Sequence, residues 1–116
     1  LVGADRIANN GDFANKVGTY SLAVNAHHHG VPFHAVAPYS TVDLTCATGA
    51  EIPIEDRQPD EVLGYREIQW APIGSHAFNP SFDVTPVKLL TSLILDRGVL
   101  DRNDLAANGL ARSLGK

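Results

Sequence analysis

The opening stretch LVGADRIANNGDFANKVGTY, residues 1–20, decides the fold of this chain. A short apolar run ends at Asp5 and Arg6, a polar loop spans residues 9–12, and a helical pattern begins near Asn15 and Lys16. This order predicts a strand, a polar loop and a helix. In an open α/β sheet, ligands bind beyond the carboxyl ends of the strands, where free N–H groups of helix N-termini attract anions. A carboxylate at the strand end, with an amide and a lysine at the helix start, suits a phosphorylated, hydroxyl-rich ligand.

The residues that follow extend this stretch into a βαβ unit. We expect a helix over residues 15–29 that Gly30 ends. Its apolar stripe consists of Val17, Tyr20 and Val24. Residues 31–37 predict a buried strand, so the sheet should be parallel and the crossover right-handed.

The middle of the chain, residues 39–79, is irregular because proline and glycine interrupt each pattern. Short strands are expected only at residues 52–55 and 75–78. A long irregular segment in a compact domain is often a functional loop. An excursion that packs against a neighbouring subunit explains the segment equally well.

The last third of the chain predicts two helices. Thr85 can cap a helix that starts at Pro86 and continues until Gly98 stops it. Asp101 can cap a short terminal helix, which contains Gly109.

Length and composition narrow the classes of protein to consider. A chain of 116 residues suffices for one compact domain. Its net charge of −4, without a Lys/Arg cluster, argues against nucleic-acid binding. No apolar segment approaches the ~20 residues of a membrane span, and no charged region precedes an apolar run as in a signal peptide. The single Cys46 fits a reducing compartment, so we expect a cytoplasmic protein. There is no G-x-G-x-x-G motif, so no dinucleotide cofactor is expected.

Four short motifs in one register carry a family resemblance. They are Gly3-Ala-Asp5-Arg6, Asn10-Gly11-Asp12, Asn15-Lys16 and Gly18-Thr19-Tyr20. They resemble the family that contains the methylthioribose-1-phosphate isomerases and the alpha, beta and delta regulatory subunits of eukaryotic initiation factor 2B. Further similarity runs through residues 37–44, 51–55 and 79–86, so the resemblance covers roughly the first hundred residues. This region corresponds to the C-terminal part of the family's sequence.

The resemblance implies a Rossmann-like α/β fold with a mostly parallel sheet. Residues 1–116 would form an incomplete C-terminal domain, preceded in the parent protein by a helical N-terminal domain. Because the chain begins at Leu1 within a predicted strand, we expect it to be a fragment of that parent. The resemblance also implies a homodimer, since family members dimerise through this domain.

The activity that the resemblance implies is aldose–ketose isomerisation. The parent would convert methylthioribose 1-phosphate to methylthioribulose 1-phosphate in methionine salvage, without a cofactor. Two alternatives stay open. One is a non-catalytic initiation-factor-type subunit that binds a sugar phosphate or a nucleotide, and the other is an isomerase for another phosphorylated pentose. The set Asp5, Arg6 and Asp12 favours the enzyme, but the family's catalytic cysteine lies upstream, so this chain alone should be inactive.

Asp5 is the candidate catalytic residue. Spacing alone favours a pairing with Arg6 or a turn cap, whereas the resemblance makes Asp5 the catalytic acid/base. Apolar surroundings would raise its pKa towards neutrality. Asn15 and Lys16 match the family's substrate-binding pair, although alone they would be read as solvated residues.

Other polar residues have plainer interpretations. Asp12 follows Asn10 and Gly11 and predicts an Asx turn or a helix cap. His27, His28 and His29 cannot converge on one ion from a helix, so no metal site is expected. One of the first two histidines should be buried and His29 exposed.

Two features near the candidate site complete the expectations. Cys46 should be a small packing residue and is not placed in the site. The loop Tyr39-Ser40-Thr41 follows a strand end, so it either borders a pocket or is a simple polar turn.

Overall fold

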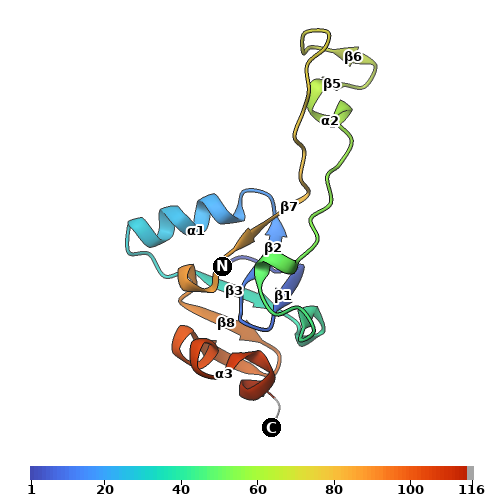
Figure 1. The fold of residues 1–116 in the computed structure, drawn as a ribbon. Coiled ribbons are helices and arrows are strands. Elements are labelled where there is room, and N and C mark those ends of the chain that lie inside the picture. Colours follow the sequence, from blue (N-terminus) through green and yellow to red (C-terminus); the bar gives the residue numbers. More distant parts are fainter. Residues whose placement is uncertain (115–116) are drawn as a thin grey trace.

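The computed structural model describes the backbone of residues 1–114, with side chains except those of 108 and 112–114, as a mixed α/β body from which a long arm projects (Figure 1). The body contains two small sheets, two longer helices that pack against them and three 3₁₀ turns. The arm comprises residues 55–80 and gives the molecule a longest dimension of 55 Å.

The first sheet has the strand order β4-β1-β2-β7. β1 (Arg6–Ala8) and β2 (Phe13–Lys16) form an antiparallel hairpin, in which Arg6 pairs with Ala14. β2 also pairs antiparallel with β7 (Phe82–Thr85), and β1 pairs parallel with β4 (Val42–Asp43).

The second sheet has the order β3-β8-β9. β3 (His34–Ala37) and β8 (Ser92–Leu95) run parallel, whereas β9 (Gly98–Asp101) returns antiparallel beside β8. The opening apolar run adds one parallel bridge, Val2 to Ala35, to the free edge of β3. The Val2 N–H donates to the carbonyl of His34 at 3.0 Å.

Helices and turns connect these strands. The longer helices are α1 (Thr19–His28) and α3 (Arg102–Leu114), and α3 is interrupted at Gly109, where φ is 62°. The 3₁₀ turns are η1 (Tyr39–Thr41), η2 (Gly49–Glu51) and η3 (Val87–Leu89). The arm carries α2 (Asp60–Leu63), β5 (Gly64–Tyr65) and β6 (Ile68–Gln69).

The hairpin β1–β2 is buried on both faces. Ile7 and Phe13 belong to the main hydrophobic cluster, whereas Ala8 and Ala14 belong to a second one. Successive side chains of a strand point to opposite faces, so neighbouring apolar residues fill two different cores. The main cluster also includes Ala23, Phe33, Ala35, Leu90, Leu93, Leu105 and Leu110. Burying each large side chain contributes about 1.5–3 kcal/mol before entropy is counted.

The expected order of strand, loop and helix at the N-terminus needs correction. The polar loop at 9–12 is the turn of a β-hairpin, and Asn15 and Lys16 lie in β2 rather than at the start of a helix. Helix α1 begins only at Thr19. The four residues of β2 pair with β7 along their whole length, and this tertiary pairing overrides the local helical pattern.

The expected apolar stripe of the helix is also wrong. Tyr20 and Val24 are 46% and 41% exposed, and Val17 precedes the helix. The buried positions of α1 are Thr19 and Ala23. The expected stop is confirmed, because Gly30 has φ 66° and the Val31 N–H donates to the carbonyl of Ala26 at 2.8 Å.

The rest of the chain gives a mixed outcome. The strand expected at 31–37 is confirmed as β3, but no strand forms at 52–55 or 75–78. The helix expected from Pro86 to Gly98 is replaced by η3 and the hairpin β8–β9. Leu93 and Ile94, two of the apolar residues that fit one helical face, instead lie in β8, which is buried on both faces.

The terminal helix is confirmed, together with its cap. The Asp104 N–H donates to Asp101 Oδ1 at 2.8 Å, and the Asp101 N–H donates to Asp104 Oδ2 at 3.1 Å. This reciprocal arrangement is a capping box.

The α/β class is confirmed, whereas a mostly parallel sheet is not. Among the strands of the described residues, two pairs are parallel and four are antiparallel. The two parallel pairs and the Val2 bridge involve strands that are far apart in sequence. Within residues 1–114, no helix is long and apolar enough to cross a membrane.

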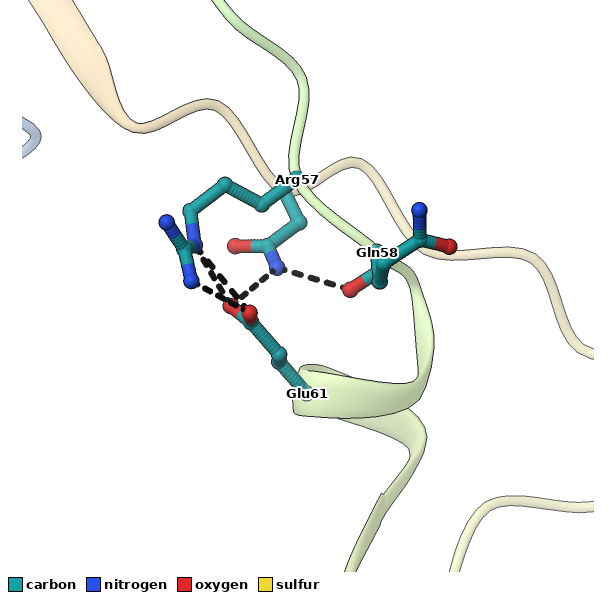
Figure 2. Close-up of polar contacts among 4 residues, drawn as sticks. Arg57, Gln58 and Glu61 are labelled. Atoms are coloured by element: carbon teal, nitrogen blue, oxygen red, sulfur yellow. Dashed lines mark hydrogen bonds and ion pairs between the residues drawn. The ribbon is translucent and has the colours of Figure 1, made fainter.

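A polar clamp closes the base of the arm. Figure 2 shows Arg57 and Glu61 facing each other, with the guanidinium donating to both carboxylate oxygens at 2.7–3.1 Å. Asn79 lies in the segment that returns from the arm to the body. Its Nδ2 donates to Glu61 Oε2 and to the Gln58 carbonyl. The Arg57 N–H donates to the Asn79 carbonyl at 2.7 Å, so side chains and backbone both join the two halves of the arm.

Candidate functional site

An open hollow lies at the start of β1, with a volume of about 540 Å³. It is lined by Asp5, Arg6 and residues 39–45, which run from η1 into β4. The loop Tyr39-Ser40-Thr41 therefore borders a hollow beside Asp5, as one of its two interpretations expected.

Asp5 lies just before β1, where the regular ladder stops. Its N–H donates to the Ala14 carbonyl at 2.8 Å, although the register pairs Ala14 with Arg6, so Asp5 and Arg6 both lie opposite Ala14 as in a β-bulge. Asp5 is exposed here, so the expectation of apolar surroundings is not met within this chain.

Two contacts orient the Asn15 side chain. Its Nδ2 donates to Thr19 Oγ1 at 3.0 Å, and that hydroxyl donates to the Lys16 carbonyl at 2.7 Å. Its amide oxygen lies 3.7 Å from where a Cβ at Gly3 would stand. A glycine at this position therefore leaves open space beside the Asn15 amide.

Lys16 points to the opposite face from Asn15, because side chains alternate along a strand. Its Nζ lies 5.6 Å from the centroid of the Phe82 ring, which belongs to the paired strand β7. The expected Asn15 and Lys16 pair thus lies in one strand with the two side chains on opposite faces, and neither residue lines the hollow beside Asp5.

The expected anion site at the N-terminus of α1 is occupied by a carboxylate of this chain. The Gly18 N–H donates to Asp83 Oδ2 at 2.7 Å, and the Tyr20 N–H donates to Asp83 Oδ1 at 3.1 Å. Asp83 therefore satisfies N–H groups that a phosphate was expected to use.

Arg6 pairs with Asp43 and not with Asp5. Arg6 Nη1 lies 3.6 Å from Asp43 Oδ2 across the hollow. The hydroxyl and the N–H of Thr45 donate to Asp43 Oδ1 at 2.5 and 3.0 Å, and together with Arg6 they lower the pKa of Asp43. The carboxyl of Asp43 is thus a fixed anion, which leaves Asp5 as the free carboxyl of the hollow's lining.

Sequence reasoning missed the support behind Tyr39. The Tyr39 N–H donates to Asp96 Oδ1 at 2.6 Å, and the Arg97 guanidinium stands 3.6 Å from the centroid of the Tyr39 ring. The signal was present, because parallel strands end at one edge of a sheet and Asp96 follows β8 as Tyr39 follows β3.

Asp12 has the structural role that was expected, although it does not cap α1. Its Oδ1 accepts the Val87 N–H at 2.8 Å and its Oδ2 accepts the Gly49 N–H at 3.0 Å. Asn10 Nδ2 also donates to Oδ2 at 2.9 Å. A Cβ at Gly49 would stand 2.8 Å from the Asp12 Cβ, so only glycine allows this approach.

Cys46 is a packing residue, as expected. It is 7% exposed in the second cluster, and its Sγ donates to the Thr48 carbonyl at 3.2 Å. Burial, followed by the charges of Glu51 and Asp43, raises the pKa of the thiol.

The three histidines of α1 and its C-terminal end are all exposed, so the expectation that one of them is buried is wrong. The rings of His28 and His29 meet edge to face, with centroids 4.9 Å apart. Among residues 1–114, no three His, Cys, Asp or Glu side chains are grouped so that they could hold a metal ion.

The sequence model of the Initiation factor 2 subunit family matches residues 1–102. The chain belongs to that family.

Curated relatives within the family carry an enzyme name. Methylthioribose-1-phosphate isomerase of Thermus thermophilus is 56% identical over 99% of this chain and 34% of its own length. The Klebsiella pneumoniae strain 342 protein of the same name is 52% identical over 98% of this chain and 34% of its length. The chain thus spans about a third of the length of these relatives.

Solved structures show the same fold. The 5-methylthioribose 1-phosphate isomerase from Pyrococcus horikoshii OT3 matches with a TM-score of 0.81 and 52% identity, over 91% of this chain and 31% of that chain. The translation initiation factor eIF-2B subunit delta from A. fulgidus matches with a TM-score of 0.85 and 34% identity, over 99% of this chain and 33% of that chain.

Proposed function

We propose that the parent protein is an S-methyl-5-thioribose-1-phosphate isomerase, which converts an aldose phosphate to the corresponding ketose phosphate in methionine salvage. The observation that carries the proposal is Asp5 at the edge of an open hollow, in a chain 56% identical to a protein of that name. The reaction needs no cofactor, because it moves hydrogen within one molecule.

The substrate poses a specific chemical problem. Phosphate on the anomeric oxygen prevents simple opening to a free aldehyde, so the enzyme must assist ring opening before hydrogen moves from C2 to C1. Asp5 acts as the general acid for ring opening and takes part in the transfer. The rest of the parent covers the hollow, because excluding water protects the intermediate and strengthens electrostatic interactions.

Asn15 and Lys16 bind the substrate in this proposal. Asn15 follows Ala14, whose carbonyl accepts the Asp5 N–H, and it offers amide groups to sugar hydroxyls. Lys16 is exposed at the end of β2, and its flexible four-carbon stem lets its ammonium reach a phosphate beyond the end of the strand.

We further propose that residues 1–116 form the C-terminal Rossmann-like domain of the parent. The parallel arrangement of Val2, β3 and β8 supports this, because it gives the strand direction of such a sheet. An N-terminal domain and the other strands of a mostly parallel sheet lie in the remaining part of the parent. The parent is a cytoplasmic homodimer.

The decisive experiment is an NMR time course of the full-length parent with methylthioribose 1-phosphate, beside its Asp5→Asn variant. We expect ketose signals from the parent and a loss of at least about 10³-fold in rate in the variant. Asp101→Asn is the matched control, because asparagine keeps the cap of α3 and lies outside the hollow. Equal rates for the parent and Asp5→Asn would remove Asp5 from catalysis.

A regulatory subunit is the second candidate, favoured by the similarity to the A. fulgidus eIF-2B delta subunit over 99% of this chain. It predicts no turnover, together with binding of a sugar phosphate or nucleotide in the same NMR samples. Turnover of a different phosphorylated pentose would instead select the third candidate, an isomerase with another substrate.

A further inference from the structure

The arm displays five large apolar side chains, most of them in its outer part. Tyr65, Ile68 and Trp70 are 61%, 73% and 64% exposed, and Ile73 and Phe78 are 99% and 84% exposed. Monomeric proteins rarely expose apolar side chains in contiguous groups unless these contact a partner. Aromatic residues of this kind dominate the energy of protein interfaces.

The arm holds these side chains in a defined orientation. Trp70 Nε1 donates to the Val62 carbonyl at 3.0 Å, and the Trp70 N–H donates to the Leu63 carbonyl at 3.1 Å. The clamp of Arg57, Glu61 and Asn79 fixes the base (Figure 2). Because these hydrogen bonds already order the arm, its side chains lose little conformational entropy when they bind a partner.

The arm is acidic as well as apolar. Residues 55–80 contain five carboxylates and two arginines, which gives a net charge of −3 with His76 neutral. An apolar tip on an acidic arm fits a partner surface that is apolar and basic.

Such a surface exists on the body of this same chain. A hollow of about 470 Å³ lies between α1 and η3, with an apolar lining that includes Tyr20, Val24 and Leu89. Lys88, Arg102 and His27 supply its polar rim, and none of its lining residues is a carboxylate. Arg102 Nη1 donates to the Lys88 carbonyl at 2.9 Å, which holds the guanidinium in place.

This groove is longer than a single hollow. A second one of about 300 Å³ shares His27, Leu89 and Arg102 with the first and continues to Pro32. The arm projects away from the body, so its tip lies clear of the groove of its own subunit (Figure 1).

We propose that the arm of one subunit docks in the α1–η3 groove of a second copy, and that the second copy returns the same contact. A two-fold axis makes such an exchange reciprocal and closed. The apolar tip covers the exposed side of α1, and the carboxylates of the arm meet the basic rim. This inference rests on the proposed homodimer, but it does not depend on the isomerase chemistry.

The test measures the dimer dissociation constant of the full-length parent by analytical ultracentrifugation. The arm variant is Ile68→Glu with Trp70→Glu, and the groove variant is Val24→Glu. Each change weakens both symmetric contacts, so we expect a rise of about a hundredfold in the dissociation constant. Val99→Glu is the matched control, because Val99 is 64% exposed on β9, outside the arm and the groove, and its dimer should be unchanged.

Mixing the two variants gives a sharper result. A mixed dimer keeps one intact arm and one intact groove that face each other, so it should form more tightly than either variant alone. Circular dichroism confirms that each variant is folded.

Three outcomes would overturn the proposal. A monomeric parent would remove the homodimer itself, whatever its isomerase activity. A dimer insensitive to both variants would remove the arm exchange and leave the homodimer intact. The arm variant could also lower the melting temperature of the protein and leave the dimer dissociation constant unchanged. That result would mean that the arm packs against the rest of its own chain.

Discussion

At the scale of single residues, Asp12 joins segments that are distant in sequence. Its carboxylate accepts N–H groups from residues 37 and 75 positions away, at the starts of η2 and η3. Both 3₁₀ turns thereby gain an anion at their N-terminal end. Asp12 fixes the loop that follows β4, and through it one wall of the hollow beside Asp5.

Replacing Asp12 should destabilise the fold. Asp12→Ala removes the acceptor of two partly buried, charge-assisted hydrogen bonds, so we expect a loss of about 2–4 kcal/mol in the free energy of unfolding. Urea denaturation monitored by circular dichroism measures it.

Two further variants separate charge from shape in this test. Asp12→Asn keeps the shape but turns a donating amide towards an N–H group, so it should also destabilise. Asp101→Asn, which keeps its cap, should change stability little. An unchanged free energy of unfolding in Asp12→Ala would show that η2 and η3 form without the Asp12 carboxylate.

Cys46 should react slowly in the folded protein. Its burial raises the pKa of the thiol, so little thiolate is present near neutral pH and reagents cannot reach it. We expect alkylation by iodoacetamide at pH 8 to be at least about a hundredfold slower than in urea, as measured by mass spectrometry. Equal rates would mean that the second cluster opens readily.

At the scale of elements, the clamp of the arm should depend on pH. Hydrogen bonds from Arg57 and then Asn79 lower the pKa of Glu61 from 4.5 to about 2. A carboxyl with a depressed folded pKa stabilises the clamp above pH 4.5, and this contribution disappears as the pH falls from 4.5 through about 2.

Hydrogen exchange tests this prediction at a single amide. The Arg57 N–H, which donates to the Asn79 carbonyl, should lose protection as the pH falls through this range. Glu61→Gln should lower its protection at neutral pH and remove the pH dependence. An unchanged profile in that variant would assign the clamp to the backbone alone.

Elements held by neighbouring residues were easier to predict than those held by distant ones. The stop at Gly30 and the cap at Asp101 depend on local signals, and sequence predicted them. The strand β3 was predicted from its apolar run, although its partner β8 lies far along the chain. The strand β2 depends on β7, about seventy residues later, so its four residues were read as a helix start. The β8 strand was misread because its Leu93 and Ile94, together with the preceding Leu90, fit a helical period.

At the scale of the whole molecule, the candidate site is an open hollow. Sequence predicted Asp5 and the neighbouring loop Tyr39–Thr41, and the structure places both at one hollow. It did not predict that Asp83 fills the helix N-terminus or that Lys16 faces Phe82, because both depend on the position of β7. Asp5 is exposed within this chain, so a pocket that excludes water requires the rest of the parent.

This chain alone should therefore not turn over methylthioribose 1-phosphate. The proposed full-length parent, with the part of the relatives that this chain does not cover, should do so under the same conditions. The measurement is the NMR assay with equal molar concentrations of chain and parent, and detectable ketose from the chain alone would contradict the expectation. Adding the separately expressed upstream part should restore turnover if the two parts assemble.

The position of the arm between β2 and β7 also sets the order of events during synthesis. Phe13 pairs with Thr85, 72 positions later, and the whole arm is translated in between. At about 5–20 residues per second, the outer edge of β2 has no partner strand for about 4–14 seconds. An unpaired strand edge invites pairing with other chains. The nascent hairpin therefore exposes this edge for a time that the length of the arm sets.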